Sequence, residues 1–169
     1  MRWRPERGAA PRKILVIQLR RIGDAVLITP ALDAIRDAWP AAEIHLLTSG
    51  AIPDLFENDP RVARIWTEPR GRPVGWLVLE IRRARFDLVL DFQSIPLTAG
   101  LSLLSGAYAV GFEKPYRRFC YRRVVSRLPQ IPDHKCVSAW IAHNPSSGAE
   151  RRLHGFRVIA GWWSRHRSR

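Results

Sequence analysis

Side chains capable of chemistry follow the two most apolar strand-like segments of the sequence. The first segment is followed by Arg20, Arg21, Gly23 and Asp24, and the second ends in the group Asp91, Gln93 and Ser94. A carboxylate and a carboxamide can move a proton and hydrogen-bond a ligand, so Asp24 and Gln93 are the candidates for chemistry. Both also have a structural interpretation, since an Asp after Gly often only caps a helix and Gln93 can serve loop backbone alone.

Apolar, β-branched runs alternate with segments of helical spacing along the chain. Strands are expected at 13–18, 43–47, 61–66, 86–91 and 107–111. Helices are expected at 30–39, 52–58, 76–85 and 97–104, the first capped by Thr29 with Pro30 at its first position and an earlier turn at 25–28. This alternation predicts an α/β fold with a doubly wound parallel sheet. Ligands bind beyond the carboxyl ends of such strands, so the two polar groups face one crevice if their strands meet at the switch point.

Several enzyme classes are excluded because their motifs are missing from the sequence. The segment Arg20-Arg-Ile-Gly-Asp24 matches neither the dinucleotide-binding glycine pattern nor a P-loop. The five histidines lack metalloprotease spacing, and no serine stands in an esterase elbow. Two cysteines, Cys120 and Cys136, form neither a zinc module nor a disulfide framework, which favours a reduced, cytoplasmic setting.

The positive charge is concentrated towards the ends of the chain. The 169 residues include 28 Lys and Arg against 15 Asp and Glu, for a formal net charge of +13. Residues 13–112 hold equal numbers of both signs, and the excess lies mainly in 1–12, 113–125 and 149–169. A neutral body argues against a nucleic-acid protein and leaves anionic lipid or a phosphorylated substrate as partners. The long uncharged stretch 92–112 contains Pro, Gly and Ser residues and is expected to be strand, helix and strand rather than a membrane span.

One continuous segment near the start of the chain reads Lys13-Ile-Leu-Val-Ile-Gln-Leu-Arg-Arg-Ile-Gly-Asp-Ala-Val-Leu-Ile-Thr-Pro-Ala-Leu32. It closely resembles the amino-terminal signature of the ADP-heptose:lipopolysaccharide heptosyltransferases, glycosyltransferase family 9. Further matches follow in order at Trp39-Pro-Ala-Ala-Glu-Ile-His45, at Arg85-Phe-Asp-Leu-Val-Leu-Asp-Phe-Gln-Ser94 and from Ser105 to Phe112. The resemblance covers residues 13–135. It implies a Rossmann-like acceptor-binding domain, the amino-terminal half of a GT-B glycosyltransferase.

The resemblance also implies roles for the candidate residues. Asp24 would be the general base that takes the proton of an acceptor hydroxyl as heptose leaves ADP-heptose with inversion. Arg20 and Arg21 would pair with anionic groups of a lipid A–Kdo acceptor, or else are solvated loop charges. Gly23, Gln93 and Ser94 are assigned to the acceptor side. No metal and no other cofactor is expected, and the enzyme would work in the cytoplasm, peripherally at the inner face of the inner membrane.

The sequence departs from the family in two places. Leu97 stands where the family usually carries a basic residue, so one contact to an acceptor phosphate is expected to be missing. The family is also about twice this length, and no second α/β domain follows residue 137. Residues 1–12 are therefore interpreted as a basic disordered N-terminus, 13–135 as the acceptor domain and 136–169 as a truncated or divergent basic tail.

Two alternatives remain open at this point. The chain could be a non-catalytic module that binds anionic glycolipid, because the donor-binding domain is missing from the pattern. The tail places Trp162 and Trp163 among arginines, which would suit docking on an anionic membrane, or it is plain unstructured sequence. A donor nucleotide sugar would be a partner only if a donor domain is supplied, and no nucleic-acid partner is expected.

Overall fold

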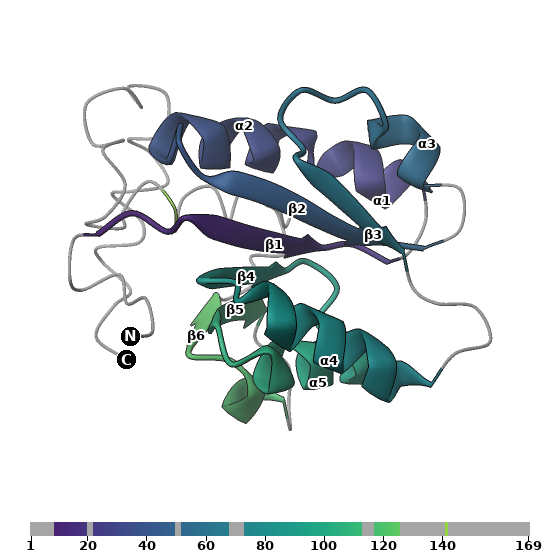
Figure 1. The fold of residues 1–169 in the computed structure, drawn as a ribbon, viewed down its shortest axis with the longest axis vertical. Helices are drawn as coiled ribbons and strands as arrows, with labels where there is room; N and C mark the ends of the chain where they lie inside the picture. Colours follow the sequence, from purple (N-terminus) through teal and green to yellow (C-terminus); the bar gives the residue numbers. More distant parts are fainter. Residues whose placement is uncertain are drawn as a thin grey trace.

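A six-stranded sheet between two helical layers forms the molecule (Figure 1). The computed structural model describes residues 9–19, 22–49, 52–67, 73–112, 117–125 and 141. The strands are β1 (Lys13–Ile17), β2 (Glu43–Thr48), β3 (Arg64–Thr67), β4 (Leu88–Asp91), β5 (Tyr108–Phe112) and β6 (Arg123–Val125). The helices are α1 (Ile22–Leu27), α2 (Thr29–Ala38), α3 (Ile52–Phe56), α4 (Val74–Ala84) and α5 (Pro96–Ser105), with a 3-10 turn η2 (Arg118–Cys120).

The strand order is β3-β2-β1-β4-β5-β6, and all five neighbouring pairs are parallel. The chain moves outward in one direction from β1 to β3, returns to the other side of β1 as β4, and continues outward to β6. The order therefore reverses between β1 and β4, which makes this pair the switch point of a doubly wound, Rossmann-like sheet. The predicted fold class is confirmed.

Two hydrophobic cores lie on the two faces of the sheet because β1 is apolar on both. Ile14 and Val16 belong to the core with α1 and α2, where Leu32, Ile35 and Trp39 are buried. Leu15 and Ile17 belong to the other core, which contains these residues from α4 and α5: Leu77, Ile81, Ala99 and Leu101. Side chains alternate between the faces of a strand, so only a continuous apolar run can fill both cores.

The element boundaries differ from the predicted ones mainly at junctions. α2 begins at Thr29 with Ile28 at the N-cap position, so Thr29 is one residue inside the helix rather than its cap. The turn expected at 25–28 belongs to a separate helix, α1, and Pro30 lies in the first turn of α2 as expected. β6 is absent from the predicted elements. It forms because the open edge of β5 pairs with it, Gly111 opposite Val124.

The stretch at 92–112 contains the loop after β4, then α5 and β5, in agreement with the sequence interpretation. Within the residues that the structure describes, no helix has the length and apolarity needed to cross a membrane. Most of the predicted N-terminus and tail lies outside the described residues. Ile141, which belongs to the predicted tail, is 1% exposed and packs in the core on the α2 side.

Candidate active site at the switch point

The carboxyl ends of β1 and β4 are held together at one edge of the sheet. Ile17 stands opposite Asp91 in the register, and the Phe92 N–H donates a 3.1 Å hydrogen bond to the Ile17 carbonyl. The chains that continue from these strands therefore start from adjacent points. The expectation that the two polar groups share one edge depended on this adjacency, which the structure shows.

On the β1 side, Gly23 and Asp24 lie in the first turn of α1, and both are exposed. A carboxylate in the first turn of a helix is favoured by the unpaired backbone N–H groups there. Space around Gly23 is open, with no atom within 4 Å of the position a Cβ would take. Asp24 is thus accessible to a ligand at this edge. Arg20 and Arg21 lie outside the described residues.

On the β4 side, the Asp91 carboxylate organises the turn that carries Gln93. Its Oδ1 accepts backbone N–H bonds from Gln93 at 2.9 Å and from Ser94 at 2.8 Å. Ser94 adopts a left-handed conformation with φ of 48°, which these two bonds hold in place. Gln93 is half-buried beside the switch point, and the bond that it contributes to this turn comes from its backbone N–H.

Ser94 is fully buried, and both its hydroxyl and its carbonyl form hydrogen bonds. Its Oγ donates to the Asp91 carbonyl at 3.2 Å and accepts the Phe112 N–H at 2.9 Å. Its own carbonyl accepts a 2.8 Å bond from Arg117 Nη1. The hydroxyl therefore ties β4 to β5, whereas its assignment to the acceptor stays a prediction.

Tyr121 contacts the second oxygen of the same Asp91 carboxylate. Its hydroxyl donates a 2.8 Å hydrogen bond to Asp91 Oδ2, and both side chains are buried. Burial raises the pKa of the Asp91 carboxyl, against the effect of the hydrogen bonds that it accepts. Burial and the neighbouring Asp91 raise the pKa of Tyr121 well above its ordinary value. Tyr121 consequently stays protonated and acts as a permanent donor to the carboxylate.

Two residues of this network, Tyr121 and Arg117, did not stand out in the sequence as partners of the β4 turn. They lie in the basic segment 113–125 that follows β5, where the sequence pattern indicates only a concentration of positive charge. Gly111 is the feature of the sequence that could have indicated this contact, because a Cβ there would come within 2.4 Å of the Tyr121 ring. A glycine in mid-strand indicates close approach of another group.

No family model and no curated protein sequence matches the chain. Solved structures do. A glycosyl transferase of family 9 from Veillonella parvula DSM 2008 superposes with a TM-score of 0.64 and 19% identity, over 80% of this chain and 43% of its own. E. coli heptosyltransferase WaaC with ADP superposes with a TM-score of 0.65 and 18% identity, over 78% of this chain and 46% of its own. E. coli ADP-heptose lps heptosyltransferase II superposes with a TM-score of 0.65 and 18% identity, over 78% of this chain and 40% of its own.

The chain has the fold of these glycosyltransferases. It spans less than half the length of each of them. Within the glycosyltransferase-like sheet, the switch-point edge is where parallel α/β sheets bind their ligands, and it is the edge that carries Asp24 and Gln93.

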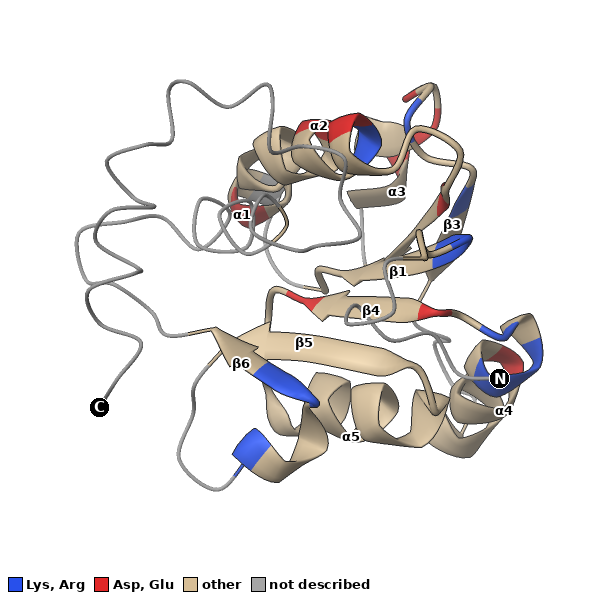
Figure 2. Cartoon of the chain, turned by 90° about the vertical axis from the view of Figure 1, so that its left-hand side faces the viewer, with Lys and Arg blue, Asp and Glu red and all other residues tan. Residues whose placement is uncertain are grey.

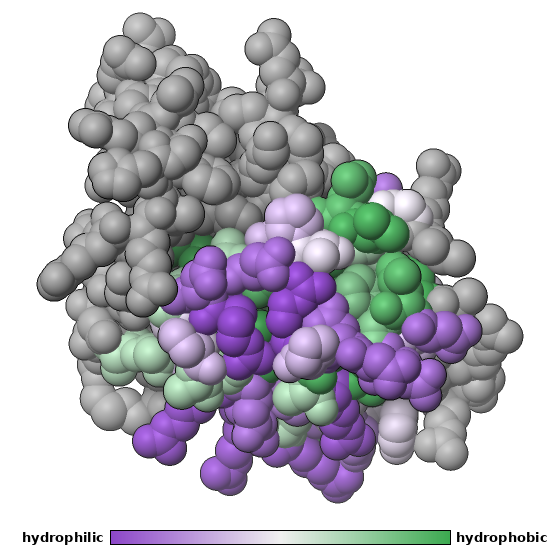
Figure 3. Space-filling model, turned by 90° about the horizontal axis from the view of Figure 1, so that it is seen from above, coloured by the Kyte–Doolittle hydropathy of each residue, from purple (hydrophilic) through white to green (hydrophobic). Residues whose placement is uncertain are grey.

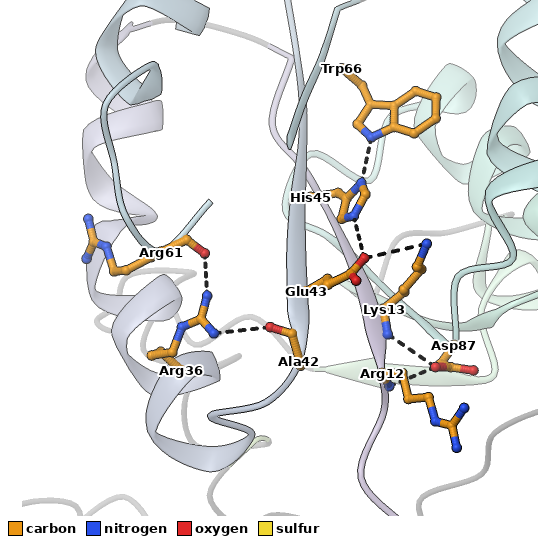
Figure 4. Close-up of polar contacts among 9 residues, drawn as sticks. All are labelled: Arg12, Lys13, Arg36, Ala42, Glu43, His45, Arg61, Trp66 and Asp87. Carbon is orange, nitrogen blue, oxygen red and sulfur yellow. Dashed lines mark hydrogen bonds and ion pairs between the residues drawn. The ribbon is translucent and has the colours of Figure 1, made fainter. Parts of the chain in front are cut away.

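Two other polar clusters lie away from this edge of the glycosyltransferase-like fold (Figure 4). In the first, Trp66 Nε1–H donates a 2.9 Å bond to His45 Nδ1, and His45 Nε2 lies 3.5 Å from Glu43 Oε2. Trp66 can only donate, so His45 Nδ1 carries no proton and the imidazole is neutral. Burial lowers the pKa of His45, which agrees with this assignment.

The second cluster joins α2 to the loop before β3. Arg36 donates to the carbonyls of Pro40, Ala42 and Arg61, and Arg61 pairs with Asp59 and Asp33 at 2.6 Å each. A surface hollow of about 490 Å³ lies here, between α2 and α3. Arg61, which lines the hollow, is paired with two carboxylates, so the cluster stabilises the loop and does not offer an unpaired charge to a ligand.

Proposed function

We propose that this chain is the acceptor-binding part of a glycosyltransferase that transfers heptose from ADP-heptose to the lipopolysaccharide inner core with inversion. The observation that carries the proposal is the exposed Asp24 at the switch-point edge of a chain with the family 9 glycosyltransferase fold. The proposed setting is the cytoplasmic face of the inner membrane, where a lipid-linked acceptor would be met.

The chemical step needs a base on the acceptor side. The acceptor hydroxyl oxygen attacks the anomeric carbon of the donor sugar, and Asp24 takes the hydroxyl proton. The bond from the anomeric carbon to the diphosphate breaks, and its electron pair leaves with ADP. Asp24 suits this role because it is exposed, sits at a helix start and lies on the ligand-binding edge.

The acceptor would be positioned by the turn after β4. Gln93 offers an amide for hydrogen bonds to acceptor hydroxyls, and Gly23 leaves open space beside Asp24. Arg117, bonded to the Ser94 carbonyl, places a guanidinium beside this turn for an anionic group of the acceptor. Arg20 and Arg21 are proposed to serve the same purpose, and Ser94 would act on the acceptor through the turn that it holds.

The donor would be bound outside the region that matches the solved glycosyltransferases. The solved glycosyltransferases are more than twice as long as the matched segment, so a second domain or polypeptide is proposed to supply the nucleotide-sugar site. No metal ion is proposed to take part, so that EDTA should leave the rate unchanged.

The decisive experiment is an ADP-release assay with ADP-heptose and a Kdo–lipid A acceptor. The chain is assayed alone and after mixing with a separately expressed family 9 donor domain, as wild type, Asp24→Asn and Asp37→Asn. Asp37 is an exposed carboxylate on α2 and serves as the matched control. We expect activity only in the mixture, with a loss of about 100-fold or more in Asp24→Asn and none in Asp37→Asn.

Equal activity in the two variants would remove Asp24 as the base. Acceptor binding with no activity in any mixture would instead favour the non-catalytic glycolipid-binding module.

A further inference from the structure

The charges of the described residues are separated between the two helical layers (Figure 2). The layer of α1, α2, α3 and their loops carries six acidic side chains: Asp24, Asp33, Asp37, Asp54, Glu57 and Asp59. Arg36 and Arg61 are the cations described there, and both are engaged in the contacts given above. Viewed from this side, hydrophilic side chains cover much of the described surface, and apolar ones gather at one side (Figure 3).

The opposite layer has the reverse charge. α4 ends in Arg82 and Arg83 with Arg85 as its cap, and all three are exposed. Arg118 on η2 and Arg122 before β6 are exposed as well, and η2 packs against α5. Figure 2 shows these basic segments on both flanks of α5. Among the residues that the structure describes in this layer, Glu80 and Asp87 are acidic. Glu80 pairs with Arg83, and Asp87 accepts hydrogen bonds from the backbone N–H groups of Arg12 and Lys13.

The outward surface of this basic layer is also apolar. α4 buries Leu77 and Ile81 against the sheet, yet the positions facing away from it include Trp76 at 41% and Leu79 at 45% exposure. α5 exposes Leu103 and Leu104 about half, and Phe119 on η2 is 71% exposed. The outward face of a surface helix is normally polar, as it is on α2, and exposed apolar surface of this kind marks interaction sites.

We propose that the outward face of α4, α5 and η2 docks on an anionic phospholipid surface. Arginines that flank exposed Trp, Leu and Phe side chains are the combination that binds the headgroup region, with guanidinium groups on phosphates and apolar side chains below them. The acidic α1–α3 layer is repelled by the same surface, so the charge separation orients the molecule. Nucleic acid would use the arginines but gives no reason for leucines to be exposed between them.

This inference goes beyond the proposed function, because it concerns bare phospholipid and needs neither acceptor nor donor. It does bear on a lipid-linked acceptor, since Val74 and Trp76 begin α4 at the same sheet edge that carries Asp24. Docking would then hold that edge close to the lipid surface.

The test is flotation of the full chain with vesicles of phosphatidylcholine alone or with phosphatidylglycerol added. Two double variants disrupt the face, Leu79→Ser with Leu103→Ser and Arg82→Glu with Arg118→Glu. Two controls alter exposed positions on the opposite layer, Leu55→Ser and Asp37→Lys. All changes are at exposed sites, and thermal unfolding checks that each variant is folded.

We expect the wild type to bind the anionic vesicles and not the neutral ones. Each double variant should lower the partition coefficient by about tenfold or more, while both controls bind like wild type. Wild-type binding by both double variants would overturn the proposal and assign any affinity to another part of the chain.

Two further outcomes would also contradict the proposal. Binding of an RNA oligomer that only the arginine variant loses would make the face a nucleic-acid surface. A dimer in sedimentation that both double variants dissociate would make it an interface between copies. Neither result would bear on the transferase proposal, because neither measurement includes an acceptor glycan or a donor sugar.

Discussion

The Tyr121 side chain packs against Gly111 of β5, and its hydroxyl donates a 2.8 Å hydrogen bond to Asp91 at the end of β4, thirty residues earlier in the chain. This bond connects the end of β4 to the segment that precedes β6. It also fixes the turn that carries Gln93, because the other oxygen of the same carboxylate holds that turn.

Replacing Gly111 with alanine should destabilise the folded protein. In Gly111→Ala the new Cβ would lie 2.4 Å from the Tyr121 ring, so the ring or the strand must move. We expect the free energy of unfolding to fall by about 1–3 kcal/mol in urea denaturation. Gly100→Ala on α5 is the control, since open space surrounds it and alanine favours a helix. Equal effects of the two changes would show that Tyr121 does not fill this position.

Asp91 should be needed mainly as an acceptor of hydrogen bonds. Asp91→Ala leaves two backbone N–H groups and the Tyr121 hydroxyl without their partner, and we expect a loss of about 3 kcal/mol in unfolding free energy. Asp91→Asn keeps an oxygen for the two N–H groups and should cost about 1 kcal/mol or less. If Asn were as damaging as Ala, the negative charge rather than the acceptor geometry would be the important property.

His45 should make the protein less stable in mild acid. Burial lowers its pKa in the folded state, so the unfolded chain takes up a proton first, near the ordinary pKa of about 6.5. Its stabilising effect is therefore complete above about pH 6.5 and declines as the pH falls through the folded pKa. Protonation would also place an N–H against the Trp66 N–H.

The measurement is the unfolding free energy of wild type and His45→Gln at about pH 7.5 and about pH 5.5. Gln can still accept the Trp66 bond but does not titrate. The wild type should lose more stability between the two pH values than the variant. Parallel pH profiles would mean that His45 titrates alike in the folded and unfolded states.

Gln93→Ala should separate acceptor binding from folding. The turn is held by the Gln93 backbone N–H, which the substitution keeps, so we expect the unfolding free energy to change by about 0.5 kcal/mol or less. In the complemented transferase assay, KM for the acceptor should rise several-fold while the KM for ADP-heptose stays unchanged. An effect on the donor KM alone would place Gln93 on the wrong side of the reaction.

The sequence was sufficient to predict the strands on which the site stands. The apolar run of β1 can only be satisfied with both faces covered, and the alternation with helices makes its neighbours parallel. Ligand binding at strand ends then selected Asp24 and Gln93 without any contact information. Their place at one edge was conditional on strand order, which local patterns do not determine and which the structure supplies.

The contacts that hold the site could not be predicted in the same way. Tyr121 lies among arginines, in a segment whose local pattern is that of a charged surface. It is buried because its partner Asp91 lies thirty residues away, and such pairing is decided by the tertiary fold. The charge separation can be followed along the chain, because the acidic side chains of the α1–α3 layer lie between residues 24 and 59 and the arginines of the other layer lie between 82 and 122. A single sum over 13–112 hides it, and only the fold shows that the two stretches form opposite layers.

The pairing of β1 with β4 also determines the order in which the molecule can form. Asp87, just before β4, accepts a bond from the backbone N–H of Lys13, 74 residues earlier. Until that segment has been synthesised, β1 to β3 can assemble with α1 to α4, but one long side of β1 has no partner. The core around Leu15 and Ile17 also still lacks the residues that α5 contributes. An unpaired strand edge can pair with strands of other chains, so the nascent protein is most prone to aggregate before β4 has been synthesised. Chaperones should therefore be needed mainly during that part of synthesis.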